Sequence, residues 1–306
     1  MNCIFGIDIG GTEIKIGKFY QDKLVLKTSI RTDVSNNGVN IFPDIFTKIE
    51  ELLDGDQLLG IGVGVPGPVV KGVVRGAQNL GWGNVEAEKL LQEHYPGIIV
   101  RVINDANAAA IGEMAIGSAR RFRNFVFVTL GTGIGGGVVI NGELYEGFTG
   151  SAGEIGHLPV ATGKKRLCNC GLYDCHERYA SATGLVYSAE EMRKGKKTIL
   201  NDIELNAKNI FDAAKAGDEV ALAAVDFMVE KMAIALSTVA ATINPEAFVI
   251  GGGVSKAGDF LLTKIRRKFQ ELCFMELRGT EFVLASLGND AGIYGAAYEI
   301  RKRMEA

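Results

Sequence analysis

The sequence predicts an α/β protein built from two similar halves. Short apolar runs typical of strands alternate with longer segments in which apolar residues recur every three or four positions, as in helices. A strand, a Gly/Thr-rich turn and a returning strand occur twice, at 5–17 and 127–139. With 306 residues there is room for two domains of ordinary size. We therefore expect two halves that face each other, with a boundary near 112–123.

The first half opens with a hairpin. Residues 4–10 form an apolar run, and the alternating stretches 12–20 and 24–32 predict two further antiparallel strands. The turn DIGGT joins two strands and lacks the GxGxxG spacing of a dinucleotide-binding turn. It is either a plain hairpin turn or one that presents N–H groups to a phosphate. A helix, a strand, a second helix and a second strand are then expected at 39–53, 59–65, 85–94 and 98–102.

Asp105 stands where the last of these strands ends and an alanine-rich helix begins. One interpretation is a helix N-cap, for which Asp is favoured. The other is a functional carboxylate, because open α/β sheets bind ligands at the carboxyl ends of their strands. The residue alone does not decide between them.

The second half begins with an apolar strand at 125–130 and the glycine-rich turn GTGIGGG. A glycine turn at 251–253 follows a strand, either as a simple connection or as a site where a base or ribose approaches the backbone. Helices are expected at 207–214 and 219–243, and the strand before the glycine turn at 248–250. A helix from about 256, a strand at 281–285 and a final helix at 292–304 are expected after it.

A cysteine cluster predicts a metal site. Cys168, Cys170 and Cys175 lie within eight residues, and His157 precedes them in GEIGH. Three thiolates and one imidazole complete a tetrahedral zinc set, which would be structural because no position stays open. Free buried thiols are the alternative. His176, between the last cysteine and Glu177, is expected at the surface without a role.

Composition excludes several classes of function. The net charge of −3 implies no basic surface for nucleic acid. No apolar run is long enough to span a membrane, and the amino terminus lacks the pattern of a signal peptide. An odd number of cysteines, five, fits a reducing compartment. We therefore expect a cytoplasmic protein without nucleic-acid or membrane partners.

The motifs together resemble the ROK family of sugar kinases and repressors. DIGGTEIKIG, GVPGPV, NLGW, NDANAAAIGE, LGTGIGGG, GEIGH, CNCGLYDCHE and INPEAFVIGGG occur in the family's order over nearly the whole chain. The resemblance implies the two-domain hexokinase/actin-like ATPase (ribonuclease H-like) fold, with a cleft between domains. The smaller domain would comprise 1–116 with helix 292–306 packed back on it. The larger would comprise 117–291, with a zinc-binding insert at 157–178.

The resemblance also implies roles for residues. Asp105 resembles the catalytic base that takes the proton of a sugar 6-hydroxyl, and Asn104 beside it a sugar-binding asparagine. Further sugar contacts are expected from Gly67, Asn79, Glu154, His157 and Glu177. The zinc ligands would be His157, Cys168, Cys170 and Cys175, so that His157 serves both zinc and sugar. Nucleotide contacts are expected from Gly10, Gly11, Thr12, Lys15, Gly131, Thr132, Gly133 and Gly252.

The expected activity is phosphoryl transfer from ATP to the 6-hydroxyl of a hexose, glucose first, by a homodimeric glucokinase of glycolysis. Mg²⁺ would bridge phosphate oxygens, with Asp8 as a water-mediated partner. N-acetylmannosamine or N-acetylglucosamine kinase is the alternative. A sugar-responsive repressor is disfavoured, because the first glycine turn leaves no room for a preceding DNA-binding module. Two departures from the family pattern, Asp174 for glycine and His176 for a leucine-like residue, bring into question the fit around the sugar.

Overall fold

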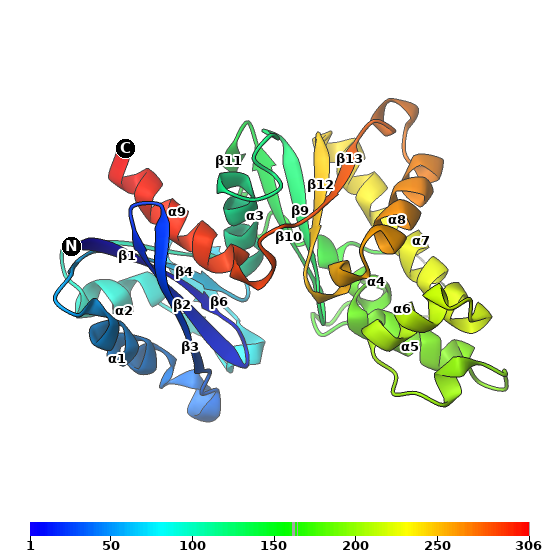
Figure 1. The fold of residues 1–306 in the computed structure, drawn as a ribbon, viewed down its shortest axis with the longest axis horizontal. Coiled ribbons are helices and arrows are strands. Elements are labelled where there is room, and N and C mark those ends of the chain that lie inside the picture. The colour runs from blue at the N-terminus through cyan, green and yellow to red at the C-terminus, as the bar shows by residue number, and fades with distance from the viewer. Residues whose placement is uncertain (161–162, 164, 306) are drawn as a thin grey trace. The chain divides into compact units, whose positions relative to one another are not determined.

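The computed structural model describes residues 1–160, 163 and 165–305. The chain forms two compact units (Figure 1). Unit 1 comprises Met1–Arg121, Gly137–Ala152 and Leu287–Ala306, and unit 2 comprises Phe122–Gly136 and Gly153–Ser286. Residues 161, 162, 164 and 306, which belong to the expected zinc insert and final helix, lie outside the described residues.

Unit 1 is built on a sheet with the strand order β3-β2-β1-β4-β8. The pairs β1–β2 and β2–β3 are antiparallel, whereas β1–β4 and β4–β8 are parallel. Its elements are β1 (Asn2–Ile9), β2 (Glu13–Tyr20), β3 (Lys23–Arg31), α1 (Ile41–Leu53), β4 (Gln57–Val65), β5 (Val69–Val70), β6 (Val73–Arg75), β7 (Asn84–Val85), α2 (Ala87–His94), β8 (Ile99–Asn104), α3 (Asp105–Ala115), β11 (Glu143–Leu144) and α9 (Ala291–Glu305).

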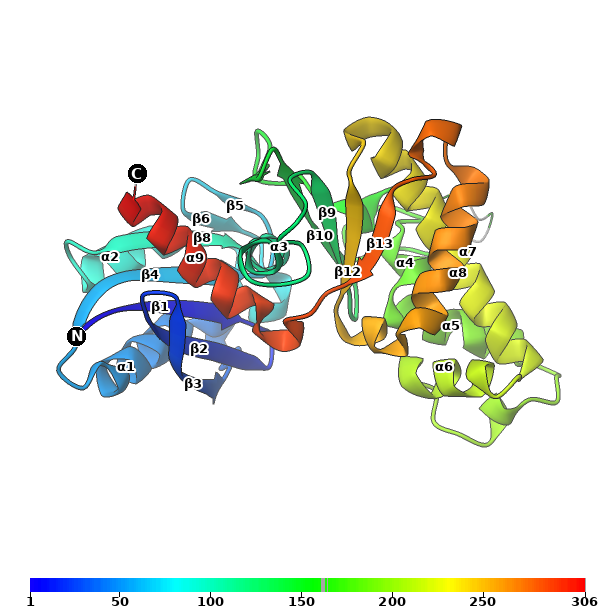
Figure 2. The same cartoon turned by 45° about the horizontal axis from the view of Figure 1, so that its top comes forward.

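Helices cover both faces of this sheet (Figure 2). On one face α1 buries Ile41, Ile45 and Ile49, whose four-residue spacing aligns them along one side of the helix. On the other face α9 lies so close that a Cβ on Gly62 would fall 1.9 Å from the Ala296 carbonyl oxygen. A Cβ on Gly295 would fall 1.7 Å from a carbonyl oxygen of α3. Glycine is therefore required where α9 meets β4 and α3.

Unit 2 contains most of a second sheet, whose strand order is β11-β10-β9-β12-β13. Strands β9, β12 and β13 run parallel, and the division between units falls within β10, at Gly136. The elements not yet given are β9 (Phe125–Leu130), β10 (Ile134–Ile140), α4 (Glu177–Ala180), α5 (Ala182–Met192), α6 (Ala207–Lys215), α7 (Glu219–Ile243), β12 (Ala247–Gly251), α8 (Asp259–Leu272) and β13 (Glu281–Leu284).

An aromatic cluster joins α8 to this sheet. The ring of Phe269 lies 5.8 Å from that of Phe248 and 5.1 Å from that of Phe282, centroid to centroid. The longest helix, α7, begins at the side-chain cap of Asp218 and ends at Asn244, which has φ 51°. Both residue types suit those positions, because Asp accepts from the first free N–H groups and Asn tolerates left-handed backbone.

Most expected elements are confirmed within a few residues. The sequence pattern predicts one short strand between the PGP turn and residue 77, but not the whole small sheet β5-β6-β7, and it missed the helices α4 and α5. It also began α8 too early, because a 3-10 turn at Gly253–Ala257 precedes the helix. Within the described part of the chain, no helix combines the length and the apolar character that a membrane crossing needs.

Candidate functional site

The first glycine turn, residues 10–12, lies between β1 and β2 of unit 1. The Gly10 N–H donates to the Glu13 carbonyl at 2.9 Å, and the Thr32 hydroxyl donates to the Gly10 carbonyl at 2.6 Å. Gly11 is half-buried and Thr12 exposed. The turn is therefore closed by its own strands and by Thr32, which directly follows β3.

Two charged side chains flank this turn. Lys15 Nζ lies 3.5 Å from Asp8 Oδ2 and donates to the Asn289 carbonyl at 3.1 Å. Burial raises the pKa of Asp8, and the nearby ammonium of Lys15 partly offsets this.

The boundary of β8 and α3 holds Asn104 and Asp105 together with Gly67. Asn104, not Asp105, caps the helix: its Oδ1 accepts from the N–H of Ala106 at 2.9 Å and of Asn107 at 3.1 Å. Its Nδ2 donates to the Gly67 carbonyl at 3.2 Å. Asp105 Oδ1 accepts from the Ala106 N–H at 2.8 Å, and the residue is half-buried. The capping role therefore falls to Asn104.

Asn79 belongs to the same region of unit 1. It lies in the 3-10 turn Gln78–Leu80, and a Cβ built on Gly11 would stand 3.5 Å from Asn79 Nδ2. The structure thus brings Asn79 to the first glycine turn. The nearby Trp82, which stacks on Phe42 with 5.5 Å between centroids, is buried and anchors this loop.

The second glycine turn, residues 131–133, follows β9 in unit 2. The Gly131 N–H donates to the Gly133 carbonyl at 3.0 Å, while the Gly131 carbonyl accepts from the N–H of Ala182 at 2.9 Å. Gly252, with φ 81°, packs on the same turn: a Cβ there would stand 2.5 Å from the Leu130 carbonyl oxygen. The turn is therefore held from outside its own strands.

A pocket of about 510 Å³ opens beside this turn, wholly within unit 2. Its wall includes the buried ring of Phe211 and the small residues Gly253 and Ala257, and three lysines add positive charge. Its volume and its mainly apolar wall with a few charged groups fit a nucleoside. The lining residues are Gly131, Thr132, Ala182, Ala207, Lys208, Phe211, Asp212, Lys215, Gly253, Val254, Lys256 and Ala257.

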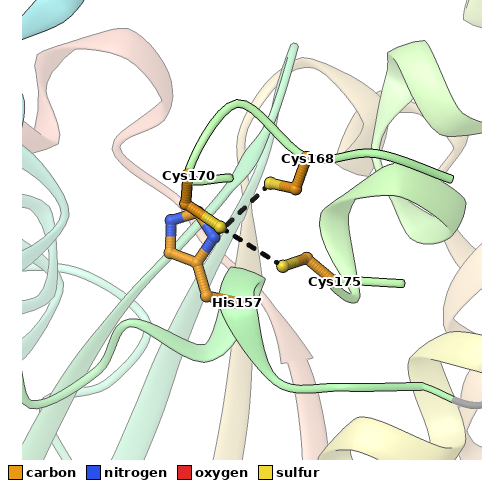
Figure 3. A group of neighbouring side chains, drawn as sticks. All are labelled: His157, Cys168, Cys170 and Cys175. Carbon is orange, nitrogen blue, oxygen red and sulfur yellow. Dashed lines mark hydrogen bonds between the residues drawn. The ribbon is translucent and has the colours of Figure 1, made fainter. Parts of the chain in front are cut away.

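The predicted metal ligands converge (Figure 3). The ligand atoms of His157, Cys168, Cys170 and Cys175 all lie within 4.8 Å of one another. Cys168 Sγ is 3.7 Å from His157 Nδ1, and Cys170 Sγ is 3.5 Å from Cys175 Sγ. Burial raises the pKa of the Cys168 thiol. Three sulfurs and one imidazole nitrogen match the donor set of a structural zinc ion.

The two departures from the family pattern have separate explanations. Asp174 has φ 60°, a left-handed conformation that glycine would also adopt. Its carboxylate accepts from the Arg166 N–H at 2.9 Å and from the Tyr179 hydroxyl. His176 is wholly buried, so the expectation of a surface position is wrong. Its Nδ1 lies 3.2 Å from the Ile155 carbonyl, and its burial lowers its pKa to about 4.

Glu154 and Glu177 lie next to the metal ligands. Glu154 Oε2 is 3.8 Å from His157 Nε2, and burial raises the pKa of Glu154. Glu177 begins α4, and its carboxylate accepts from the Cys168 thiol at 3.1 Å and from the Ile134 N–H at 3.4 Å. One carboxylate therefore connects the cysteine cluster with the strand that leaves the second glycine turn.

The predicted site residues form two sets, one in each unit. Unit 1 holds the first glycine turn with Lys15, Gly67, Asn79, Asn104 and Asp105, and unit 2 holds the second turn with Glu154, Glu177, Gly252 and the metal ligands. Sequence reasoning missed the pocket residues Phe211, Lys215 and Val254. The signal of Phe211 and Lys215 was helical periodicity, which cannot distinguish a pocket wall from core, and Val254 follows directly on the glycine turn at 251–253.

The chain is similar to known proteins over nearly its whole length. The model of the ROK family matches residues 4–303. A protein named glucokinase from Halalkalibacterium halodurans is 39% identical, with 97% of this chain and 94% of that protein covered. A glucokinase from Thermotoga maritima is 36% identical, with 98% of each covered. The crystal structure of a ROK family glucokinase from Streptomyces griseus, in complex with glucose and AMPPNP, has a TM-score of 0.80 and 32% identity over 98% of this chain and 99% of that one. The chain belongs to the ROK family, with the two-domain α/β fold of its kinases.

Proposed function

We propose that this protein is an ATP-dependent hexose kinase that transfers the γ-phosphoryl group to the 6-hydroxyl of glucose. The observation that carries the proposal is the placement of Asp105 at the carboxyl end of β8, beside Asn104 and Gly67. Full-length similarity to proteins named glucokinase supports the reaction and the sugar. The domain division at 1–116 with 292–306, and 117–291, is part of the proposal.

Asp105 is the proposed catalytic base. A hydroxyl that attacks phosphorus loses its proton as the new bond forms, and a carboxylate within hydrogen-bond reach accepts that proton. Asp105 uses Oδ1 to accept from the backbone of its helix, which fixes the carboxyl group. Asn104 fixes the helix start through its cap and keeps its amide near Gly67. The sugar contacts from this unit would be Asn104, Asp105, Gly67 and Asn79.

The nucleotide would be held by the two glycine turns and the pocket of unit 2. Phosphoryl transfer has a loose transition state, so catalysis consists of positioning and charge neutralisation. Gly10, Gly11, Thr12, Gly131, Thr132 and Gly133 would supply N–H and hydroxyl donors to the phosphates. The pocket bounded by Phe211 and Val254 would take the base and ribose, near Gly252. Lys15 would contact the phosphates, and Asp8 would contact the hydration shell of Mg²⁺, which would neutralise phosphate charge.

Zinc would be held by His157, Cys168, Cys170 and Cys175, and its role would be structural, because four protein ligands close its coordination. With Nδ1 directed to Cys168, the histidine keeps Nε2 on the side of Glu154. Ligation at Nδ1 fixes the tautomer with a proton on Nε2, which can donate to a sugar hydroxyl. Glu154 and Glu177 would accept from the neighbouring hydroxyls.

The test is ADP release by purified protein with MgATP and, one at a time, glucose, mannose, fructose, N-acetylglucosamine and N-acetylmannosamine. We expect glucose to give the highest kcat/KM. A preference for an N-acetylhexosamine would replace glucose by the alternative substrate and leave the kinase intact. Stabilisation by a sugar without any turnover would refute the kinase in favour of a sugar-responsive regulator. Inorganic polyphosphate in place of ATP tests the donor, and sedimentation tests the expected homodimer.

A further inference from the structure

Arg166, two residues before the first cysteine, is a buried arginine that the proposed reaction does not use. Its side chain is 5% exposed. Nη1 donates to the Arg178 carbonyl at 2.9 Å, the Ser188 hydroxyl at 3.0 Å and the Gly184 carbonyl at 3.4 Å, and Nη2 donates to Glu191 at 2.8 Å. A buried charge with this many partners links the segments that supply them.

Two tyrosines enclose the same guanidinium. Its carbon lies 4.5 Å from the ring centre of Tyr179 and 4.4 Å from that of Tyr187. A planar guanidinium can stack on rings and donate in its own plane at the same time, which a lysine ammonium cannot. The site is therefore built for arginine.

The backbone of Arg166 belongs to the metal-binding loop. Its N–H donates to the Asp174 carboxylate at 2.9 Å, and its carbonyl accepts from the Asp174 N–H at 2.9 Å. Residues 166 and 174 thus close the loop that carries Cys168 and Cys170, one residue before Cys175. The main chain of Arg166 therefore holds the two ends of this loop together, and its side chain binds α4 and α5.

The corner between α4 and α5 in turn holds the second glycine turn. Ala182, the first residue of α5, donates its N–H to the Gly131 carbonyl at 2.9 Å, and Glu177 at the start of α4 accepts from Ile134. The corner is tight: a Cβ on Gly184 would fall 2.7 Å from the Tyr179 carbonyl carbon. A shift of the corner would therefore move Glu177 and the turn together.

We infer that Arg166 is a positioning residue that locks the metal-binding loop to the α4–α5 corner and so sets the positions of Glu177 and the turn at 131–133. It touches neither the sugar nor the nucleotide in the proposed reaction. The inference rests on the proposed function for its kinetic consequence, but its effect on metal retention does not require phosphoryl transfer.

The experiment compares zinc-loaded wild type with Arg166→Met, whose side chain fits between the rings but donates no hydrogen bond. Transfer of zinc to a chromogenic chelator should be about ten-fold faster or more in the variant, since outer partners of metal sites contribute on that scale. Loss of the Arg166 contacts should also displace Glu177, a proposed sugar ligand, and so raise the KM for the sugar about ten-fold. A wild-type zinc-release rate together with a wild-type KM would overturn the inference.

Two further variants keep the test decisive if Arg166→Met fails to fold. Arg166→Lys retains the positive charge but lacks the planar guanidinium with its several N–H donors, so it should still release zinc faster than wild type. Glu191→Gln removes the charge of the partly exposed partner but keeps an amide oxygen that can accept from Nη2, so we expect its zinc release to stay within about two-fold of wild type. Wild-type zinc release by Arg166→Lys would refute the need for a planar guanidinium. A full effect of Glu191→Gln would refute the role of the buried hydrogen bonds, because it would assign the effect to the ion pair alone.

The proposed function and the inference fail separately. If wild type phosphorylates no sugar but Arg166→Met still loses zinc faster, the kinase is refuted and the lock remains. If wild type is an active kinase that holds no zinc, the lock is refuted, because the loop then has no metal to retain.

Discussion

The two glycine turns look alike in sequence but are supported differently. The turn at 10–12 is closed by β1, β2 and β3, and the charged pair beside it, Asp8 and Lys15, comes from the two strands that the turn connects. The turn at 131–133 is held by α5 through Ala182, and its exit strand by Glu177, both about fifty residues later in the chain.

From this difference we expect zinc at the proposed site to stabilise the second turn and not the first. The first needs only a hairpin and its neighbour strand, so its geometry is local. The second turn is bound by the α4–α5 corner, which Arg166 connects to the loop that carries the cysteines. That loop has few regular elements, so a metal cross-link would be needed to make it rigid. Three groups of variants test this contrast, from the largest expected effect to the smallest.

Removal of one metal ligand should have the largest effect. In Cys175→Ser the site loses a thiolate, and we expect loss of zinc and a fall in kcat/KM for the sugar of about 100-fold or more. Hydrogen exchange should rise at 131–134 and 177–184 and stay unchanged at 8–15. Cys273→Ser, which alters a buried cysteine outside the cluster, is the control. Equal loosening of both turns would contradict the contrast.

A methyl group in the second turn should have a smaller and more specific effect. A Cβ on Gly133 would stand 2.5 Å from Glu177 Oε2, so Gly133→Ala must displace that carboxylate, whereas a Cβ on Gly131 has nothing within 4 Å. We expect Gly133→Ala to raise the KM for the sugar about ten-fold and Gly131→Ala to change only the KM for ATP. In a Glu177→Ala background, Gly133→Ala should add little. Additive effects on the sugar would show that the two residues act independently.

The smallest effect on activity should come from the far end of the first hairpin. Asp56 accepts from Lys18 Nζ at 2.7 Å, from the Tyr20 hydroxyl and from the terminal amine, and these partners lower its pKa. Because the folded pKa lies below the unfolded value, the stabilisation is present above about pH 4 and is lost as the pH falls through the folded pKa. Asp56→Asn should melt a few degrees lower at neutral pH, with unchanged kcat and KM.

The difference in melting temperature should shrink in acid, where the wild-type carboxylate becomes protonated. A thermal melt at several pH values measures it. A difference in melting temperature that stays constant from neutral pH to well below pH 4 would mean that the charge of Asp56 does not contribute to the stability of the fold.

Periodicity predicted the long elements, and the cysteine spacing predicted the metal-ligand cluster, because those signals were local. The α1 face of Ile41, Ile45 and Ile49 is visible in the chain itself, and so are the cysteine spacings that converge in the structure. Asp105 was placed at the strand end from the change of pattern alone, but the cap was not assigned to Asn104, since either residue type can serve.

What the sequence could not predict depends on distant partners. His176 looks polar, yet its burial follows from the Ile155 carbonyl, twenty-one residues away. Arg166 looks like part of a basic loop, and only folding brings its guanidinium between Tyr179 and Tyr187. The pocket beside Gly131 is assembled from α6 and the turn after β12, which no single window of sequence contains.

The most direct test of the account is phosphoryl transfer to glucose by wild type and by Asp105→Asn, with the product identified by phosphorus NMR. Asparagine keeps the acceptor that the Ala106 N–H uses, so the helix start should be intact. We predict glucose 6-phosphate from wild type and a kcat lower by about 100-fold or more in the variant, with unchanged melting temperature and KM for ATP. A variant that retains the wild-type rate, or a product phosphorylated at another hydroxyl, would contradict the account.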